Sequence, residues 1–181
     1  YKNAVVSVED HRFYDHGPID VIAIGRALIT NMRYGQLLEG GSTITQQVAK
    51  NLYFISEDNN PIYRKFAEIF MAYDLENAYE KDEILELYMN TIYFGDGYYG
   101  IEEACQGYLG KNASKMTLFE ATMMAGIPNA PSVYAPTANL DLTLDRQRKV
   151  VSTMVENGYL TQDQADEILA DQSTFESEYN K

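Results

Sequence analysis

The residues best suited to chemistry lie near the start of the chain. The segment Glu9-Asp10-His11-Arg12-Phe13-Tyr14-Asp15-His16 places carboxylates, imidazoles and aromatic rings directly after an apolar run, Val5 to Val8. An acid at the edge of a hydrophobic element is often partly desolvated, which raises its pKa and makes it a better base. Glu9 is therefore a candidate general base, and a solvated helix end is the alternative that composition alone favours. His11 and His16 are five residues apart, which does not place them on one helix face, so we discount metal ligation by histidine.

A second segment, from Glu39 to Asn51, has the features of an anion site. Two glycines precede hydroxyl residues suited to capping a helix, and the positive end of a helix dipole favours anions. Further donors follow on the next turns, so the segment suits a phosphate or a sugar. An ordinary capped helix explains it equally well. Its candidate binding residues are Ser42, Thr43, Gln46, Gln47 and Lys50.

Two further stretches carry candidate residues. Lys65 and Glu68 lie three residues apart and can form a surface ion pair across one helical turn. The functional alternative places Arg64 and Lys65 on a pyrophosphate, with Glu68 facing the same cleft. In the stretch Lys81 to Gly95 the apolar residues are explained by core packing and the acids by a solvated helix face. Asn90 differs, because it is a polar residue near a helix end that could hold a ligand.

Composition restricts the classes of partner. The 181 residues suit one compact domain, with 14 Lys and Arg against 27 Asp and Glu and a net charge of -13. Such an acidic chain is a poor candidate for general nucleic-acid binding. Because Lys and Arg are scarce, the positions where they cluster indicate where an anionic ligand could bind. The single cysteine, Cys105, lies in a helical pattern and is expected to be a small buried residue.

Helix signals dominate the elements that must position these residues. Apolar periodicity and capping residues predict helices over Ile19 to Tyr34, Asp82 to Thr91, Leu118 to Ile127 and Asp145 to Asn157. Two more are predicted to begin at Ser42 or Thr43, continuing towards Leu52, and at Pro61, with an apolar stripe of Phe66, Ile69, Phe70 and Tyr73. Thr161 and Gln164 cap a last helix. Only Ala4 to Val8 is ambiguous between helix and strand. We therefore expect an all-α domain.

In this order, the segments resemble the family 51 glycosyltransferases, the polymerase domains of class A penicillin-binding proteins and of monofunctional peptidoglycan glycosyltransferases. The matching motifs are Glu9-Asp10-x-x-Phe13, Gly40 to Gln47, Arg64-Lys65-x-x-Glu68, Lys81 to Gly95, and Arg146 with Val150 and Val151. Two positions depart from the family's pattern. Pro18 replaces a usual glycine before Asp20, and Gln147 replaces a usual second arginine.

The resemblance implies a lysozyme-like fold with a larger helical lobe and a smaller, membrane-facing lobe. The smaller lobe would include Ile19 to Leu38, whose apolar residues Ile22, Ile29, Leu37 and Leu38 exceed one buried stripe; simple core is the first interpretation and lipid contact the second. The chain begins at Tyr1 and shows no signal peptide or membrane span, so we expect residues 1–181 to be a glycosyltransferase domain excised from a longer membrane-anchored protein.

The implied reaction polymerises lipid II into glycan strands on the extracytoplasmic face of the cell membrane, with inversion at C1 and release of undecaprenyl pyrophosphate. Glu9 and Glu68 would be the catalytic residues, and the substrate-binding residues would be Asp10, Phe13, Ser42, Thr43, Gln46, Gln47, Lys50, Arg64, Lys65 and Asn90. No protein-bound metal or obligatory cofactor is implied, although Mg²⁺ or Mn²⁺ can accompany the pyrophosphate. The partners would be lipid II, the growing lipid-linked glycan and the membrane surface, with a C-terminal transpeptidase domain as an option.

Two other functions stay open at the level of sequence. A lysozyme-like muramidase or lytic transglycosylase also uses carboxylates on a helical fold, but it needs no pyrophosphate site. A non-catalytic cell-wall binding domain would have no reason to keep both Glu9 and Glu68.

Overall fold

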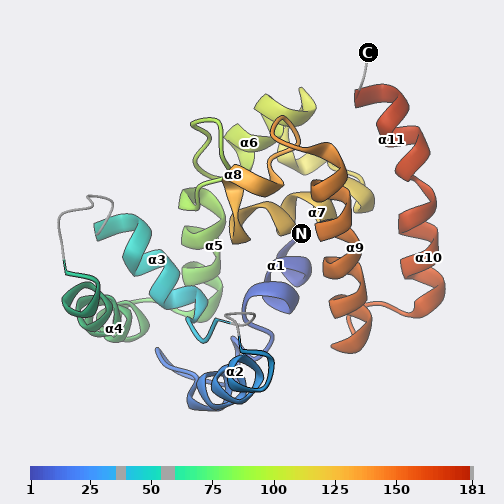
Figure 1. Ribbon diagram of the computed structural model, residues 1–181. Coiled ribbons are helices and arrows are strands. Elements are labelled where there is room, and N and C mark those ends of the chain that lie inside the picture. The colour runs from blue at the N-terminus through green and yellow to red at the C-terminus, as the bar shows by residue number, and fades with distance from the viewer. Residues whose placement is uncertain (36–39, 54–59, 180–181) are drawn as a thin grey trace. The chain divides into compact units, whose positions relative to one another are not determined.

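The computed structural model of the chain describes residues 1–35, 40–53 and 60–179. These residues form helices and one isolated antiparallel bridge, between Tyr93 and Tyr99, so the all-α class is confirmed for the part of the chain described (Figure 1). The α-helices are α1 (Lys2–Glu9), α2 (Val21–Tyr34), α3 (Ile44–Tyr53), α4 (Pro61–Ala78), α5 (Lys81–Thr91), α6 (Ile101–Leu109), α7 (Leu118–Gly126), α8 (Pro131–Tyr134), α9 (Leu140–Glu156), α10 (Gln162–Ala170) and α11 (Gln172–Tyr179), with short 3-10 helices η1 (Ala113–Lys115) and η2 (Ile127–Asn129).

The chain divides into two compact units. Tyr1–His11 and Met89–Lys181 form the first, and Arg12–Tyr88 form the second, so the division falls within α5. In the first unit α1 packs against α7 and α9. Four successive residues of α1, Ala4 to Ser7, are buried, which explains why periodicity could not distinguish helix from strand in this run. Burial on several faces removes the alternation that marks either element.

Capping residues fix the helices of the first unit. The reciprocal capping boxes of Thr117 with Glu120 and of Thr161 with Gln164 are both present, as predicted. Helix α9 begins earlier than the predicted Asp145, because the Asn139 side chain accepts from the Leu142 N–H and caps the helix there. Cys105 is fully buried in α6, as expected.

In the second unit the predicted stop at Gly35 and the predicted start at Pro61 are confirmed, while α2 begins two residues after the predicted Ile19. The Asp20 carboxylate accepts from the N–H groups of Ile22 and Ala23 and begins α2, which Gly35 ends at a φ of 66°. Pro61 is the first residue of α4, behind the cap Asn60. Helices α3 and α4 of this unit pack side by side (Figure 1).

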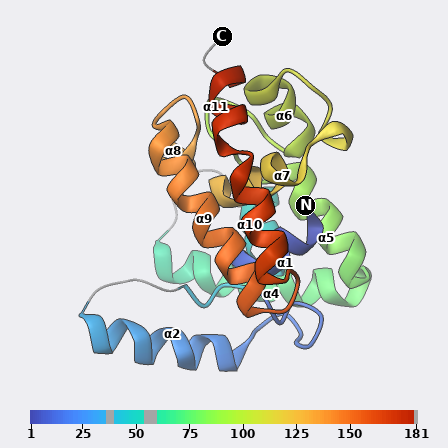
Figure 2. The same cartoon turned by 90° about the vertical axis from the view of Figure 1, so that its right-hand side faces the viewer.

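Two helices of the second unit present apolar side chains to solvent. Helix α2 is one uninterrupted helix (Figure 2) in which Ala27 is the buried residue, while Ile22, Ile29 and Met32 are 55%, 70% and 83% exposed. Simple core therefore does not explain the apolar excess of this segment; Leu37 and Leu38 lie outside the described residues. The stripe of Phe66, Phe70 and Tyr73 on α4 is likewise exposed, and the same helix buries Glu68, Ala72 and Leu75 instead.

Within the described residues, no helix combines the length and apolarity needed to cross a bilayer.

Candidate active site

A pocket of about 380 Å³ opens between α3 and α4. It lies wholly within the second unit and is built from two sequence motifs, one within residues 42–50 and the other within residues 61–68. Its lining residues are Ser42, Gln46, Gln47, Lys50, Pro61, Arg64, Lys65 and Glu68. The structure therefore brings together six of the predicted substrate-binding residues and one of the two predicted catalytic acids.

Lys65 is the central cation of this pocket. Its ammonium donates to Ser42 Oγ at 2.8 Å and to Gln46 Oε1 at 2.8 Å. It also contacts the Glu68 carboxylate, with Nζ 3.3 Å from Oε2. These contacts connect the start of α3 to the first turns of α4 and hold one positive charge at the wall of the pocket.

Glu68 is the one buried charge among the lining residues, at 5% exposure. Its second carboxylate oxygen lies 3.5 Å from Arg64 Nε, so the acid is paired with two cations at once. A buried carboxylate needs such partners because desolvation of an unpaired charge is costly. With Lys50, Arg64 and Lys65 against Glu68, the pocket carries a net charge of +2 in a chain of net charge -13.

The start of α3 is held by hydrogen bonds to the loop before α2. Thr43 Oγ1 and Gln46 Nε2 both donate to the Pro18 carbonyl, at 3.0 and 2.9 Å. The Gln46 N–H also donates to Thr43 Oγ1 at 3.2 Å, so Thr43 caps α3 as predicted. A Cβ at Gly41 would lie 3.0 to 3.1 Å from atoms of Ile24, so a side chain there would require Ile24 to shift by a few tenths of an ångström. Pro18, the departure from the family pattern, thus supplies the carbonyl that anchors this motif.

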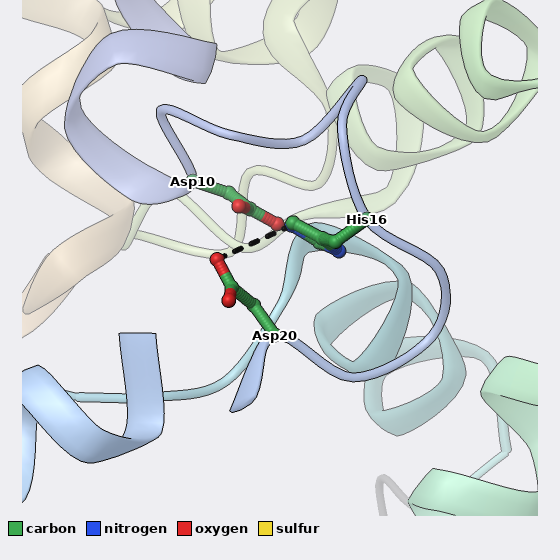
Figure 3. Close-up of side chains that lie close together, drawn as sticks. All are labelled: Asp10, His16 and Asp20. Carbon is green, nitrogen blue, oxygen red and sulfur yellow. Dashed lines mark ion pairs between the residues drawn. The ribbon is translucent and has the colours of Figure 1, made fainter. Parts of the chain in front are cut away.

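Asp20 stabilises the loop after the first motif. Arg12 Nε lies 3.3 Å from its carboxylate, and the His16 ring faces the same group at 4.0 Å (Figure 3). Burial by itself would raise the pKa of the Asp20 carboxyl, but the N–H groups of Ala23 and Ile22, together with His16 and Arg12, lower that pKa below its ordinary value. Asp20 is therefore an anionic anchor for the segment Arg12 to His16.

The remaining predicted site residues lie elsewhere. Glu9 is the half-buried last residue of α1, and Asp10 follows it as a buried residue that ends the helix. Both belong to the first unit, as does Asn90, which is exposed at the end of α5. Phe13 is fully buried in the second unit, and Thr43 is 1% exposed. These two side chains support the motifs from inside the protein.

Three residues that were not predicted as site residues, Thr45, Glu76 and Lys81, form a polar network in the second unit. Glu76 Oε1 accepts from Thr45 Oγ1 and from Lys81 Nζ, both at 2.6 Å, and Lys81 Nζ lies 4.5 Å from the centre of the Phe13 ring. The available signal was a Lys and a Glu five residues apart across a helix break, which is weak by itself.

Gln147, the second departure from the family pattern, lies in the core of the first unit. It is fully buried, and its amide donates to the Phe119 carbonyl at 3.0 Å and to Thr122 Oγ1 at 3.1 Å. A neutral amide fits this position because a charged group would require a buried partner.

The comparisons with known proteins agree with this arrangement of motifs. The family model for transglycosylases matches residues 1–155, and the chain therefore belongs to this family of glycosyltransferases of peptidoglycan synthesis. Among its relatives, penicillin-binding protein 1A of Neisseria flavescens is 46% identical over 175 residues, which is 97% of this chain and 22% of that protein. Penicillin-binding protein 1A of Aquifex aeolicus is 44% identical over 165 residues, with 91% of this chain and 22% of that protein covered.

A solved structure is also similar. The crystal structure of penicillin-binding protein 1A from Haemophilus influenzae is 29% identical, covers 70% of this chain and 15% of its own, and superimposes with a TM-score of 0.47. The chain thus spans about a fifth of the length of the curated relatives that it matches.

Proposed function

We propose that the chain polymerises lipid II and that the pocket between α3 and α4 binds the diphosphate of the lipid-linked donor. The observation that carries this proposal is the concentration of Lys50, Arg64 and Lys65 around one pocket of an acidic chain. A diphosphate needs several cationic donors at short range, and a polymer of uncharged sugars does not.

In the proposed reaction, the 4-hydroxyl of the acceptor's N-acetylglucosamine attacks C1 of the donor's N-acetylmuramic acid. The C1–oxygen bond to the diphosphate breaks as the new glycosidic bond forms, and the departing electron pair becomes negative charge on the diphosphate. The hydroxyl proton passes to Glu9, a step that contributes about 10²- to 10⁴-fold when the base is well placed. Because no enzyme nucleophile takes part, the configuration at C1 inverts.

The pocket residues have separate roles in this proposal. Lys50, Arg64 and Lys65 stabilise the leaving diphosphate, and Glu68 holds the last two in place through its ion pairs. Ser42, Gln46 and Gln47 supply polar contacts to the same ligand. Asp10 and Asn90 are proposed to bind sugar, while buried Phe13 and Thr43 shape the motifs.

A divalent cation held by the protein does not fit this pocket. The lining side chains offer one carboxylate, Glu68, and that group is already paired with Arg64 and Lys65. Mg²⁺ and Mn²⁺ prefer several oxygen ligands. Such an ion would therefore enter with the diphosphate, and no step of the proposed reaction requires it.

We also propose a location and partners. The exposed apolar face of α2 suits the interface of a lipid bilayer, where the lipid-linked substrates reside. The catalytic domain, proposed to span residues 1–181, would act on the extracytoplasmic face of the cell membrane. The relatives are several times longer than this chain, which leaves room in the parent protein for a C-terminal transpeptidase domain.

The direct test supplies lipid II to the purified full-length protein and separates the products by length. Polymer that lysozyme can digest supports the proposal. Cleavage of finished glycan without polymer would assign the rival hydrolase activity, and binding of glycan without any turnover would assign the non-catalytic function.

A further inference from the structure

An ion pair outside the pocket joins the end of α4 to the start of α5. Lys81 Nζ lies 2.6 Å from Glu76 Oε1, and the two side chains are only 21% and 14% exposed. A pair so shielded from water is more costly to break than a surface pair, because removing one partner leaves an uncompensated charge.

Each member of this pair has a second contact. The same oxygen of Glu76 accepts from Thr45 Oγ1 at 2.6 Å, and Thr45 is a fully buried residue of α3 directly before Gln46. The Lys81 ammonium lies over the Phe13 ring, 4.5 Å from its centre, which is within the range of an attractive cation–π contact.

The neighbouring residues strengthen the same connection. Tyr14 donates from its hydroxyl to the Asp82 carboxylate at 2.9 Å, next to the contact between Phe13 and Lys81. Phe13 is the last residue of the first motif and Tyr14 follows it, four and five residues after Glu9. The network therefore ties this loop to both helices that line the pocket, and every one of these residues belongs to the second unit.

We propose that Lys81 and Glu76 are positioning residues for glycosyl transfer. They touch no reacting atom; they hold the loop that follows the catalytic base through Phe13, and they fix that loop to α3 through Thr45. This inference rests on the proposed function. The pocket has its own internal bonds, from Lys65 to Ser42, Gln46 and Glu68, so it should keep its shape when the Lys81 charge is lost.

The test compares Lys81→Met, Glu76→Gln, the double variant and Lys81→Arg in the full-length protein. Measurements are kcat and KM for lipid II, affinity for inorganic pyrophosphate by calorimetry, and thermal unfolding. Lys111→Met is the matched control, because Lys111 forms a similarly shielded pair with Glu120, at 2.7 Å and 33% and 8% exposure, in the first unit.

We expect Lys81→Met to lower kcat about tenfold while KM and pyrophosphate affinity change less than twofold. Glu76→Gln should lower kcat similarly, and the double variant should be no worse than the single ones, because both act through one network. Lys81→Arg should recover most of the rate, since a guanidinium keeps the charge and stacks on Phe13. Lys111→Met should lose stability without a loss of kcat.

A rate for Lys81→Met within twofold of the wild type would overturn the proposal, as would an equal loss of kcat in Lys111→Met. Amide hydrogen exchange separates this failure from failure of the proposed function. Even if the wild-type protein made no polymer, faster exchange of residues 12–18 in Lys81→Met, with α7 and α9 unchanged, would support the network, and unchanged exchange of residues 12–18 would overturn it.

Discussion

Lys65 and Glu68 face each other on α4, with the ammonium nitrogen 3.3 Å from the carboxylate. The pair keeps one cation at the pocket wall although 45% of the Lys65 side chain is exposed. We predict that Lys65→Met weakens binding of inorganic pyrophosphate about tenfold, since a charge contact near 4 Å contributes about 1 to 4 kcal/mol at surface-like dielectric constants. Titration calorimetry at fixed ionic strength measures the change.

The matched control for this prediction is Lys149→Met. Lys149 is an exposed lysine of α9 in the first unit, so its loss changes the net charge by the same amount. Its pyrophosphate affinity should stay within twofold of the wild type. Equal weakening in both variants would mean that net charge, and not the pocket, controls binding.

The apolar face of α2 leads to a prediction about lipid. Ile29→Ser with Met32→Ser should reduce sedimentation of the protein with phospholipid vesicles several-fold, because both side chains are exposed and would enter the bilayer interface. Stability should change by less than about 0.5 kcal/mol, as expected for surface positions. Leu142→Ser, at a 40% exposed position of α9, is the control and should leave sedimentation unchanged. Unaltered vesicle binding by the double α2 variant would rule out this surface as the lipid contact.

The lowered pKa of Asp20 predicts a pH-dependent contribution to stability. The charged carboxylate is favoured in the folded state, so its contribution is present above the ordinary value of 3.8 and is lost as pH falls through the lower folded value. Asp20→Asn keeps a side-chain oxygen for the α2 cap but removes the charge. Chemical denaturation should find the wild type more stable than Asp20→Asn from pH 5 to 7, with the margin shrinking below about pH 4. A margin that grew on acidification would contradict the assignment.

Cys105 should be unreactive in the folded protein. Burial, with additional contributions from Glu102 and Glu120, raises the pKa of its thiol to about 12. The thiolate, which is the reactive form, is then negligible at pH 8. Iodoacetamide should label the thiol at least a hundredfold more slowly in the native protein than in guanidinium chloride, as judged by mass spectrometry. Rapid native labelling would mean that α6 opens readily.

Much of the fold followed from local signals. The caps at Thr117 and Thr161 and the stops at Gly35 and Gly158 depend on a few adjacent residues, which is why sequence locates them. The cap at Asp20 was not predicted from sequence. The start of α9 was missed because the leucines directly behind the Asn139 cap, at 140, 142 and 144, alternate with a period of two and do not follow helical spacing. The α4 stripe was predicted correctly in register, but periodicity cannot say whether a face meets core or solvent.

The candidate site shows the same limit. Spacing suggested that Lys65 and Glu68 could pair, and the structure confirms the pair. The approach of α3 to α4, which adds Ser42 and Gln46 to the same ammonium, is a tertiary contact between residues about twenty positions apart. No local pattern encodes such a contact, and the same holds for Thr45 with Glu76.

The most direct test of the central claim is the rate of lipid II polymerisation by Glu9→Gln. Glutamine keeps the size of the side chain at the end of α1 and cannot accept the hydroxyl proton. We predict a loss of at least about a hundredfold in kcat, with unchanged thermal unfolding and unchanged affinity for inorganic pyrophosphate. Polymerisation by Glu9→Gln at the wild-type rate would contradict the account.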